Sequence, residues 1–211
     1  MADMKHPFAE RLVAAENEIQ LRIKEIARDI ARDYHDKVSH ASPLVLVCVL
    51  KGAYLFMADL CRALGDLGLP TKHEFICVSS YGGGTASSGE VRMLLDLRSP
   101  IRGQHVLMVE DIVDTARTLD FLLKVFGNRS PASLKMVTLL DKKKQRLVPL
   151  RADYFCFDVD DFVVGYGLDY DEKLRELRDV IAFNEEAYKA IVDQARKREM
   201  KPSNVPPMSK L

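Results

Sequence analysis

The residues best suited to chemistry lie together in the segment VEDIVDTART, residues 109–118. Glu110 and Asp111 end an apolar run, and Asp114 follows after two further apolar residues. We expect a strand before these acids and a helix after them, so backbone N–H groups of residues 114–118 should be unpaired at the positive end of the helix dipole. Two threonines and an arginine add donors there, without the G-x-x-x-x-G-K-[ST] pattern of a Walker loop. The loop therefore suits a phosphate monoester.

The two adjacent acids suit a different chemical group from the loop that follows them. Carboxylates accept hydrogen bonds from neighbouring hydroxyls, so Glu110 and Asp111 fit a ribose ring. Phosphate beside ribose indicates a pentose phosphate as the ligand. Capping of the next helix would account for a single acid, but three acids before Thr-x-Arg-Thr favour a binding site.

The periodicity of apolar residues predicts the elements that must position this segment. Isoleucines at spacings of three and four predict an amphipathic helix over residues 16–37. The remaining expectations are strands at 44–50, 73–79, 105–109 and 133–140, helices at 53–67 and 117–126, short strands near 154–157 and 163–166, and a final helix at 185–198 capped by Asn184.

The alternation of strands and helices from residue 43 to residue 140 predicts an α/β fold with a mostly parallel twisted sheet flanked by helices. Ligands of such sheets bind at the carboxyl ends of the strands. The unusual loops all fall at such ends, at residues 50–52, 80–81, 110–118 and 141–142.

Composition narrows the class of protein. The 31 basic and 31 acidic residues of the 211-residue chain cancel, which argues against nucleic acid as the partner. The four cysteines are widely spaced, so we expect reduced, buried side chains. The five histidines show no zinc-ligand spacing, no run of about 18 apolar residues predicts a membrane span, and the N-terminus has no secretory signal.

The segment VEDIVDTART resembles the phosphoribosyl-diphosphate-binding signature of the type I phosphoribosyltransferases. Over about residues 43–182 the chain is similar to the hypoxanthine-guanine phosphoribosyltransferases of purine salvage, through VLKGAYLF, ICVSSYG, LLDK and DFVVGYGLDYDEKLRELRD in that order. The resemblance implies the type I phosphoribosyltransferase fold in a single domain spanning 1–211. Within this domain the resemblance implies a core at about 38–141, a small hood lobe from about 8–37 and 142–198, and a flexible tail at 199–211.

The resemblance implies a role for each matching residue on the sugar-phosphate side. Glu110 and Asp111 would hold the ribose hydroxyls, and Asp114 would be the general acid/base that faces purine N7. The 5′-phosphate would be bound by Asp114, Thr115, Ala116, Arg117 and Thr118. Pyrophosphate would be bound by the backbone of Leu50, Lys51 and Gly52 and stabilised by the charges of Lys51 and Arg175; the Leu50–Lys51 peptide bond is often cis in the family. Ser80, Tyr81 and the glycine-rich stretch would form a mobile lid.

On the base side, the resemblance implies that Lys142 meets the purine 6-oxo group, Phe162 stacks on the base and the Val163 backbone reads its ring edge. Asp169, with Glu110 and Asp111 as further candidates, would ligate Mg²⁺. Each of these roles has an ordinary alternative. Lys142 would be one of three solvated lysines, Phe162 a core residue and Asp169 the cap of a turn. Arg175 would be a charge on a helix surface, residues 50–52 a plain strand exit and the expected lid a passive loop.

The activity implied is Mg²⁺-dependent transfer of a 5-phosphoribosyl group from phosphoribosyl diphosphate to N9 of hypoxanthine or guanine, giving IMP or GMP and pyrophosphate, in a dimer or tetramer. A non-catalytic nucleotide-sensing relative and a phosphoacceptor signalling domain are the alternatives. Ala116 departs from the glycine that is common in the family. At positive φ an alanine costs about 1 kcal/mol.

The C-terminal residues Ser209, Lys210 and Leu211 match the peroxisomal address that an import receptor reads. Three nearby prolines should keep the approach to them extended. We expect a peroxisome or glycosome-like organelle from this tripeptide and otherwise the cytoplasm; a chance match is the alternative.

Overall fold

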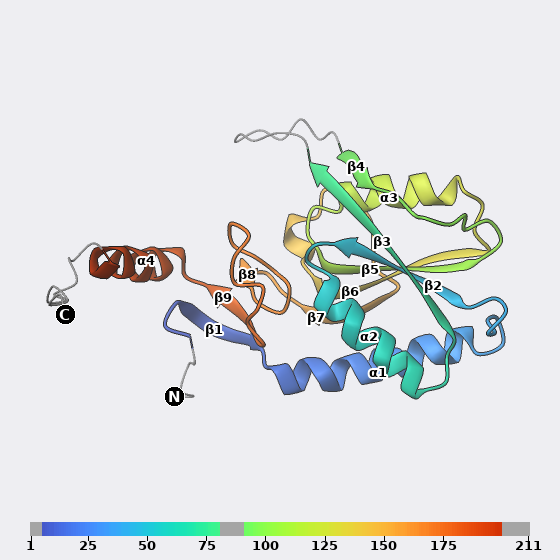
Figure 1. Cartoon of the computed structure of the whole chain (residues 1–211), viewed down its shortest axis with the longest axis horizontal. Coiled ribbons are helices and arrows are strands. Elements are labelled where there is room, and N and C mark those ends of the chain that lie inside the picture. Colours follow the sequence, from blue (N-terminus) through green and yellow to red (C-terminus); the bar gives the residue numbers. More distant parts are fainter. Residues whose placement is uncertain (1–5, 81–90, 200–211) are drawn as a thin grey trace, which may run out of the picture.

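The computed structural model describes residues 6–80 and 91–199 (Figure 1). Tyr81 of the expected lid and the terminal Ser-Lys-Leu lie outside the described residues. The elements are β1 (Ala9–Ala14), α1 (Glu16–Tyr34), β2 (Leu44–Leu50), α2 (Tyr54–Asp66), β3 (Thr71–Ser80), β4 (Val91–Leu95), β5 (His105–Val113), α3 (Arg117–Gly127), β6 (Ser133–Asp141), a 3₁₀ helix (Lys143–Gln145), β7 (Tyr154–Asp158), β8 (Val163–Val164), β9 (Val180–Phe183) and α4 (Glu185–Glu199). Among the described helices, none has the length and apolar character that a membrane crossing requires.

Six strands form the main sheet, in the order β4-β3-β2-β5-β6-β7. Five of them run parallel, and the edge strand β4 pairs antiparallel with β3. The predicted, mostly parallel sheet is confirmed. Because the parallel strands share one direction, the loops after β2, β3, β5 and β6 leave the sheet at the same edge.

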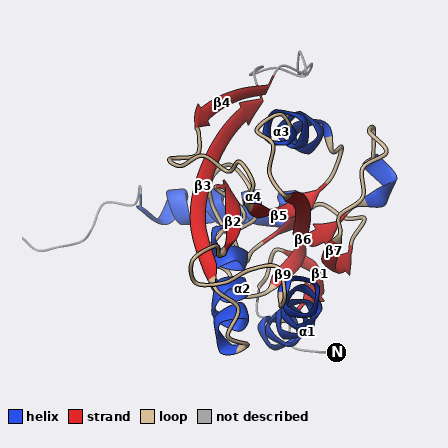
Figure 2. Cartoon of the chain, turned by 90° about the vertical axis from the view of Figure 1, so that its right-hand side faces the viewer, coloured by secondary structure: helices blue, strands red, loops and turns tan. Residues whose placement is uncertain are grey.

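Helices cover both faces of this sheet (Figure 2). Leu44, Leu46 and Cys48 of β2 belong to the core under α1 and α2, whereas Val45 and Val47 belong to the core under α3. Alternate residues of one strand therefore enter opposite cores, as expected for a strand buried on both sides. This burial explains why the strand is a continuous apolar run without polar alternation.

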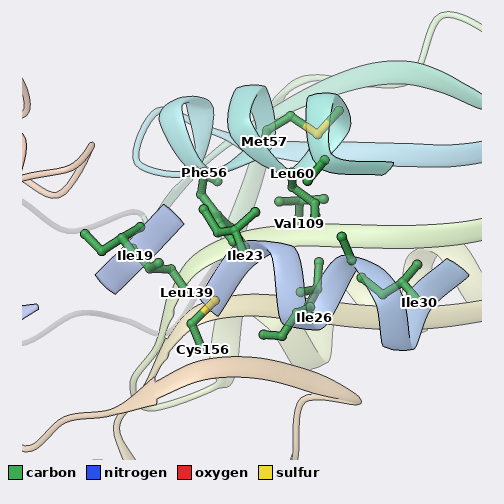
Figure 3. Packing of buried hydrophobic residues seen from close by; sticks show 14 of the residues in the cluster. Ile19, Ile23, Ile26, Ile30, Phe56, Met57, Leu60, Val109, Leu139 and Cys156 are labelled. Carbon is green, nitrogen blue, oxygen red and sulfur yellow. The ribbon is translucent and has the colours of Figure 1, made fainter. Parts of the chain in front are cut away.

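The first core is dominated by the isoleucines of α1 (Figure 3). Ile19, Ile23, Ile26 and Ile30 are at most 2% exposed and pack with Phe56 and other residues of α2 and of the sheet. Each such side chain contributes about 1.5–3 kcal/mol through burial. The predicted amphipathic stripe is confirmed, and its partner surface is the sheet with α2.

A second sheet joins the two ends of the chain, in the order β1-β9-β8 with antiparallel pairing. Its apolar residues form a separate small cluster with Phe8, Tyr170 and Tyr188. The helix α4 follows β9 and extends away from the main sheet (Figure 1). The amide of Ala187 donates to Asn184 Oδ1 at 2.9 Å, which confirms the predicted cap of α4.

Three strands were not predicted from the sequence, because the local pattern of apolar residues is weak in each. β1 is exposed at its centre, β4 is an edge strand with mostly exposed side chains, and β9 has only four residues. β5 is also longer than predicted, because it continues through both acids to Val113 by pairing with β6. Such pairing depends on distant residues, so local periodicity underestimates it.

The prediction that the four cysteines are unpaired is confirmed, but the prediction that all four are buried is wrong for two of them. All four cysteines are free, yet only Cys48 and Cys156 are buried. Cys61 on α2 and Cys77 on β3 are partly exposed. Burial raises the pKa of both Cys48 and Cys156 to about 12, so these thiols stay protonated.

Candidate functional site

A cavity of about 290 Å³ lies at the carboxyl edge of the sheet, where the loops after β2 and β5 meet the loop between β8 and β9. This loop belongs to residues 142–198, which are called the hood segment below. Ten of the residues predicted from the sequence line it: Lys51, Gly52, Glu110, Asp111, Asp114, Thr115, Ala116, Thr118, Asp169 and Arg175. Residues separated by more than 120 positions in the sequence are thus brought to one site. The predicted ligand edge of the sheet and the observed cavity coincide.

The loop between β5 and α3 presents free backbone donors. Within the described part of the chain, no hydrogen bond leaves the backbone amides of residues 115–118. Ala116 has φ 65° and ψ 6°, the left-handed conformation, and α3 begins at the next residue. Ala116 therefore lies in the backbone region in which an alanine costs about 1 kcal/mol relative to glycine. These free amides lie at the start of α3, which is the positive end of its dipole and favours an anion.

Glu110 and Asp111 lie at the end of β5 in surroundings that disfavour negative charge. Burial and the neighbouring Asp111 carboxylate hold the pKa of Glu110 well above its usual range. Burial also raises the pKa of Asp111, although its Oδ1 accepts from the amide of Ile112 at 2.7 Å. A ligand that brings hydroxyl donors or positive charge would relieve this electrostatic cost.

Gly52 lies between the paired acids and the hood segment. A Cβ at Gly52 would come 1.5 Å from Asp111 Oδ2, and a Cβ at Gly167 would come 2.1 Å from the carbonyl oxygen of Gly52. Gly167 also has φ 99°. The two loops can touch only because both residues lack side chains. The preceding Leu50–Lys51 peptide bond is cis, as the family resemblance implied.

The cationic side of the cavity contains Lys51 and Arg175. Arg175 Nη2 lies 2.9 Å from Asp169 Oδ1 and 3.3 Å from Glu172 Oε2, and Lys51 Nζ lies 2.7 Å from the same Glu172 oxygen. Arg175 Nη1 donates to the carbonyl of Gly167 at 2.8 Å. Arg175 is not on a helix, because its segment is an irregular loop. The alternative of a helix-surface charge is therefore wrong.

Lys142 differs from the two lysines that follow it. Its residue is 5% exposed and has no ion pair among the described residues. Lys143 and Lys144 are exposed and pair with Asp158 at 2.5 Å and Asp160 at 2.7 Å. The alternative of three equivalent solvated lysines is therefore wrong. Lys142 is held beside the β5 loop by its backbone amide, which donates to the carbonyl of Val113 at 2.9 Å.

Arg146 was not singled out by the sequence, because no local pattern separates it from the exposed lysines before it. Its Nε donates to the carbonyl of Asp114 at 3.0 Å and its Nη2 to that of Val113 at 3.1 Å. The guanidinium also pairs with the buried carboxylate of Asp141. The neighbouring Gln145 amide lies 3.0 and 3.2 Å from the two carboxylate oxygens of Asp114 when its nitrogen faces them. These residues fasten the β5 loop to the β6 loop.

Phe162 and Val163 lie in the hood segment, and neither lines the cavity. Phe162 is 55% exposed and makes tilted contact with Phe183 at 5.9 Å between ring centroids. It is therefore not a core residue. Val163 is buried and pairs with Ala182 in the small sheet. Lys142 and Arg117 are likewise outside the cavity lining, and Arg117 is exposed.

Comparisons with known proteins agree with this geometry. The family model for the phosphoribosyl transferase domain matches residues 16–171. Hypoxanthine-guanine phosphoribosyltransferase from Crithidia fasciculata is 47% identical over 190 residues, which cover 89% of this chain and 91% of that protein. The protein of that name from Mycobacterium avium is 49% identical over 168 residues, which cover 79% of this chain and 81% of its own.

Two solved structures of the Trypanosoma cruzi hypoxanthine phosphoribosyltransferase are similar to the whole fold. One, from a study of its C-terminal region, has a TM-score of 0.84 and 53% identity, and covers 90% of this chain and 98% of that one. The other, in complex with the product IMP, has a TM-score of 0.82 and 54% identity, with 86% and 98% covered. Because the family model spans more than half of the chain and these relatives cover most of it, the chain belongs to the phosphoribosyl transferase domain family, among its hypoxanthine-guanine phosphoribosyltransferases.

Proposed function

We propose that this protein transfers the 5-phosphoribosyl group of phosphoribosyl diphosphate to N9 of hypoxanthine or guanine, with release of pyrophosphate. One observation carries the proposal. The paired acids Glu110 and Asp111 line the same cavity as Thr115, Ala116 and Thr118, whose backbone amides are free among the described residues. Acids accept hydrogen bonds from the ribose hydroxyls, and the amides bind the 5′-phosphate. Hypoxanthine-guanine phosphoribosyltransferases among its relatives support the same activity.

Charge must be stabilised on both sides of the bond that breaks. The anomeric carbon gains oxocarbenium character as pyrophosphate departs, and Lys51 with Arg175 stabilises the leaving anion. In this proposal Asp114 exchanges the proton at purine N7. Its backbone carbonyl is held by Arg146 and its carboxylate by Gln145, so its position does not depend on the substrate.

In the proposed purine site, Lys142 donates to the 6-oxo group, Phe162 stacks on the base and Val163 reads the ring edge. The position of Lys142 supports this role, because its side chain is mostly buried and its ammonium group makes no ion pair or hydrogen bond with the described residues, which leaves it free for an acceptor. A lysine donor would face another donor in adenine, so we expect adenine to be rejected. The exposure of Phe162 leaves its ring free for stacking.

The residues present fit Mg²⁺. No described group of three or more His, Cys, Asp or Glu could form an all-protein metal cage. Mg²⁺ usually takes one or two carboxylates together with substrate oxygens and waters. Asp169 on the pyrophosphate side, and Glu110 with Asp111 on the ribose side, supply such donors, and the raised pKa of Glu110 marks negative charge that a cation would stabilise. Bound Mg²⁺ would neutralise charge on pyrophosphate.

The proposal is tested by initial rates with phosphoribosyl diphosphate and Mg²⁺, using hypoxanthine, guanine, xanthine and adenine in turn. We expect IMP and GMP from the first two bases and no AMP. Asp114→Asn should lower kcat for IMP formation by at least a hundredfold while nucleotide still binds. A wild-type chain that binds IMP but forms none would instead identify a nucleotide sensor.

Two further predictions have their own tests. Deletion of Ser209, Lys210 and Leu211 from a tagged chain should move it from peroxisome-like organelles to the cytosol; a diffuse signal before deletion would contradict the address. A dimer or tetramer should appear by light scattering. Support comes from the exposed Phe75 and Leu94 on β3 and β4, whose apolar surfaces suit a second copy.

A further inference from the structure

We infer that Glu172 competes with pyrophosphate for Lys51 and Arg175, the two cations that bind pyrophosphate. The Glu172 carboxylate bridges both cations, and it accelerates pyrophosphate release by re-forming its ion pairs with them. The inference rests on the proposed function, because that function assigns Lys51 and Arg175 to pyrophosphate. It adds a residue to which the sequence analysis assigned no role and which does not line the cavity.

The contacts of Glu172 place one anionic oxygen between two loops. Glu172 Oε2 lies 2.7 Å from Lys51 Nζ and 3.3 Å from Arg175 Nη2. Lys51 follows β2, whereas Arg175 belongs to the hood segment, so the carboxylate joins parts of the chain that are 121 residues apart. A phosphate oxygen bound by both cations would have to displace it.

The backbone holds Glu172 in place before any anion arrives. Its amide donates to Asp169 Oδ2 at 2.9 Å, and Asp169 Oδ1 in turn pairs with Arg175 at 2.9 Å. Glu172 has φ 62° and Asp171 has φ 52°, both in the left-handed region, which glutamate seldom occupies. Such conformations persist only where surrounding contacts determine them, and they cluster at ligand sites.

Because Glu172 and Lys51 are exposed to solvent, an incoming anion can displace the Glu172 carboxylate from the two cations. The side chains of Lys51 and Glu172 are 62% and 63% exposed, whereas Arg175 is 17% exposed. Exposed ion pairs are weak, so pyrophosphate with its higher charge displaces the carboxylate without a large cost. The expected effect of removing the carboxylate is therefore modest, a two- to fivefold change in pyrophosphate affinity.

The test compares Glu172→Gln with Glu176→Gln in the full-length chain. Both variants remove one negative charge from the same loop, and Glu176 is exposed and makes no ion pair among the described residues. Calorimetry with magnesium pyrophosphate should show two- to fivefold tighter binding for E172Q and less than a 1.5-fold change for E176Q. The gain should shrink at 0.5 M salt, because salt screens exposed pairs.

Steady-state kinetics supply an independent readout. E172Q should show a lower inhibition constant for pyrophosphate and a lower KM for phosphoribosyl diphosphate, with the KM for hypoxanthine unchanged. Equal pyrophosphate affinities for E172Q, E176Q and wild type would overturn the inference while leaving the proposed function intact. A wild type that forms no IMP would overturn the proposed function, and the calorimetric comparison would still decide the role of Glu172.

Discussion

The contact between Gly52 and Asp111 allows a sharp test of how the site is built. In Gly52→Ala the new Cβ would lie 1.5 Å from Asp111 Oδ2, 2.5 Å from its Cγ and 3.3 Å from its Cβ. Ordinary contacts of a Cβ begin near 3.4 Å. The Asp111 side chain must therefore rotate away, since the backbone of Gly52 is confined on its other side by Gly167.

The magnitude follows from what that rotation breaks. Asp111 Oδ1 would lose its 2.7 Å hydrogen bond from the Ile112 amide, and a bond to a charged group is worth about 1.5–3 kcal/mol. Stiffening of the unfolded chain by alanine returns about 0.4–1 kcal/mol. We expect the free energy of unfolding to fall by about 1–2 kcal/mol. Because Asp111 would no longer face the ribose, KM for phosphoribosyl diphosphate should rise by about tenfold or more.

Urea unfolding and initial-rate kinetics measure the two effects, and Gly65→Ala is the matched control. Gly65 lies within α2 and a Cβ there meets no atom within 4 Å. That variant should gain up to about 1 kcal/mol of stability through helix propensity, with kinetics unchanged. If G52A kept the wild-type KM and matched G65A in stability, the crowding argument and the ribose role of Asp111 would both be refuted.

The remaining predictions concern charge, a loop anchor and a helix cap. Burial raises the pKa of Glu110 in the folded protein, so ionisation of Glu110 opposes folding. The protein is therefore more stable while Glu110 is protonated, and that stability is lost as the pH rises through the folded-state pKa of Glu110. Glu110→Gln should therefore melt higher than wild type at pH 8 and equally at pH 4 without ligand; a gap that widens toward acid would contradict this. Arg146→Gln should lose about 3 kcal/mol in urea unfolding by leaving Asp141 unpaired, and the double variant with Asp141→Asn should recover part of the loss. Strictly additive losses would exclude coupling between them. Asn184→Ala should cost about 1 kcal/mol and speed amide exchange in the first turn of α4. Asn128→Ala, at the C-terminal end of α3, removes a side chain that makes no hydrogen bond among the described residues and should change neither quantity; an equal loss of stability in both variants would count against the cap.

The local sequence determined the elements of the core and the chemistry of the central loop. Apolar runs and helical stripes are properties of neighbouring residues, so β2, α1 and α2 agree with their predicted bounds within a few positions. The acids before a threonine-rich turn identified the β5 loop for the same reason. The sequence left the φ of Ala116 open, and the structure places it in the left-handed region.

Only the tertiary structure decided which distant residues share the site and which of similar residues matter. Lys142 is buried and Lys143 is ion-paired at the surface, although the sequence presents them as one basic run. The importance of Arg146 and Glu172 arises from partners more than 30 and 120 residues away, respectively. Burial and pairing of this kind depend on how the strands and hood segment pack together, and short-range patterns of residue type carry no information about that packing.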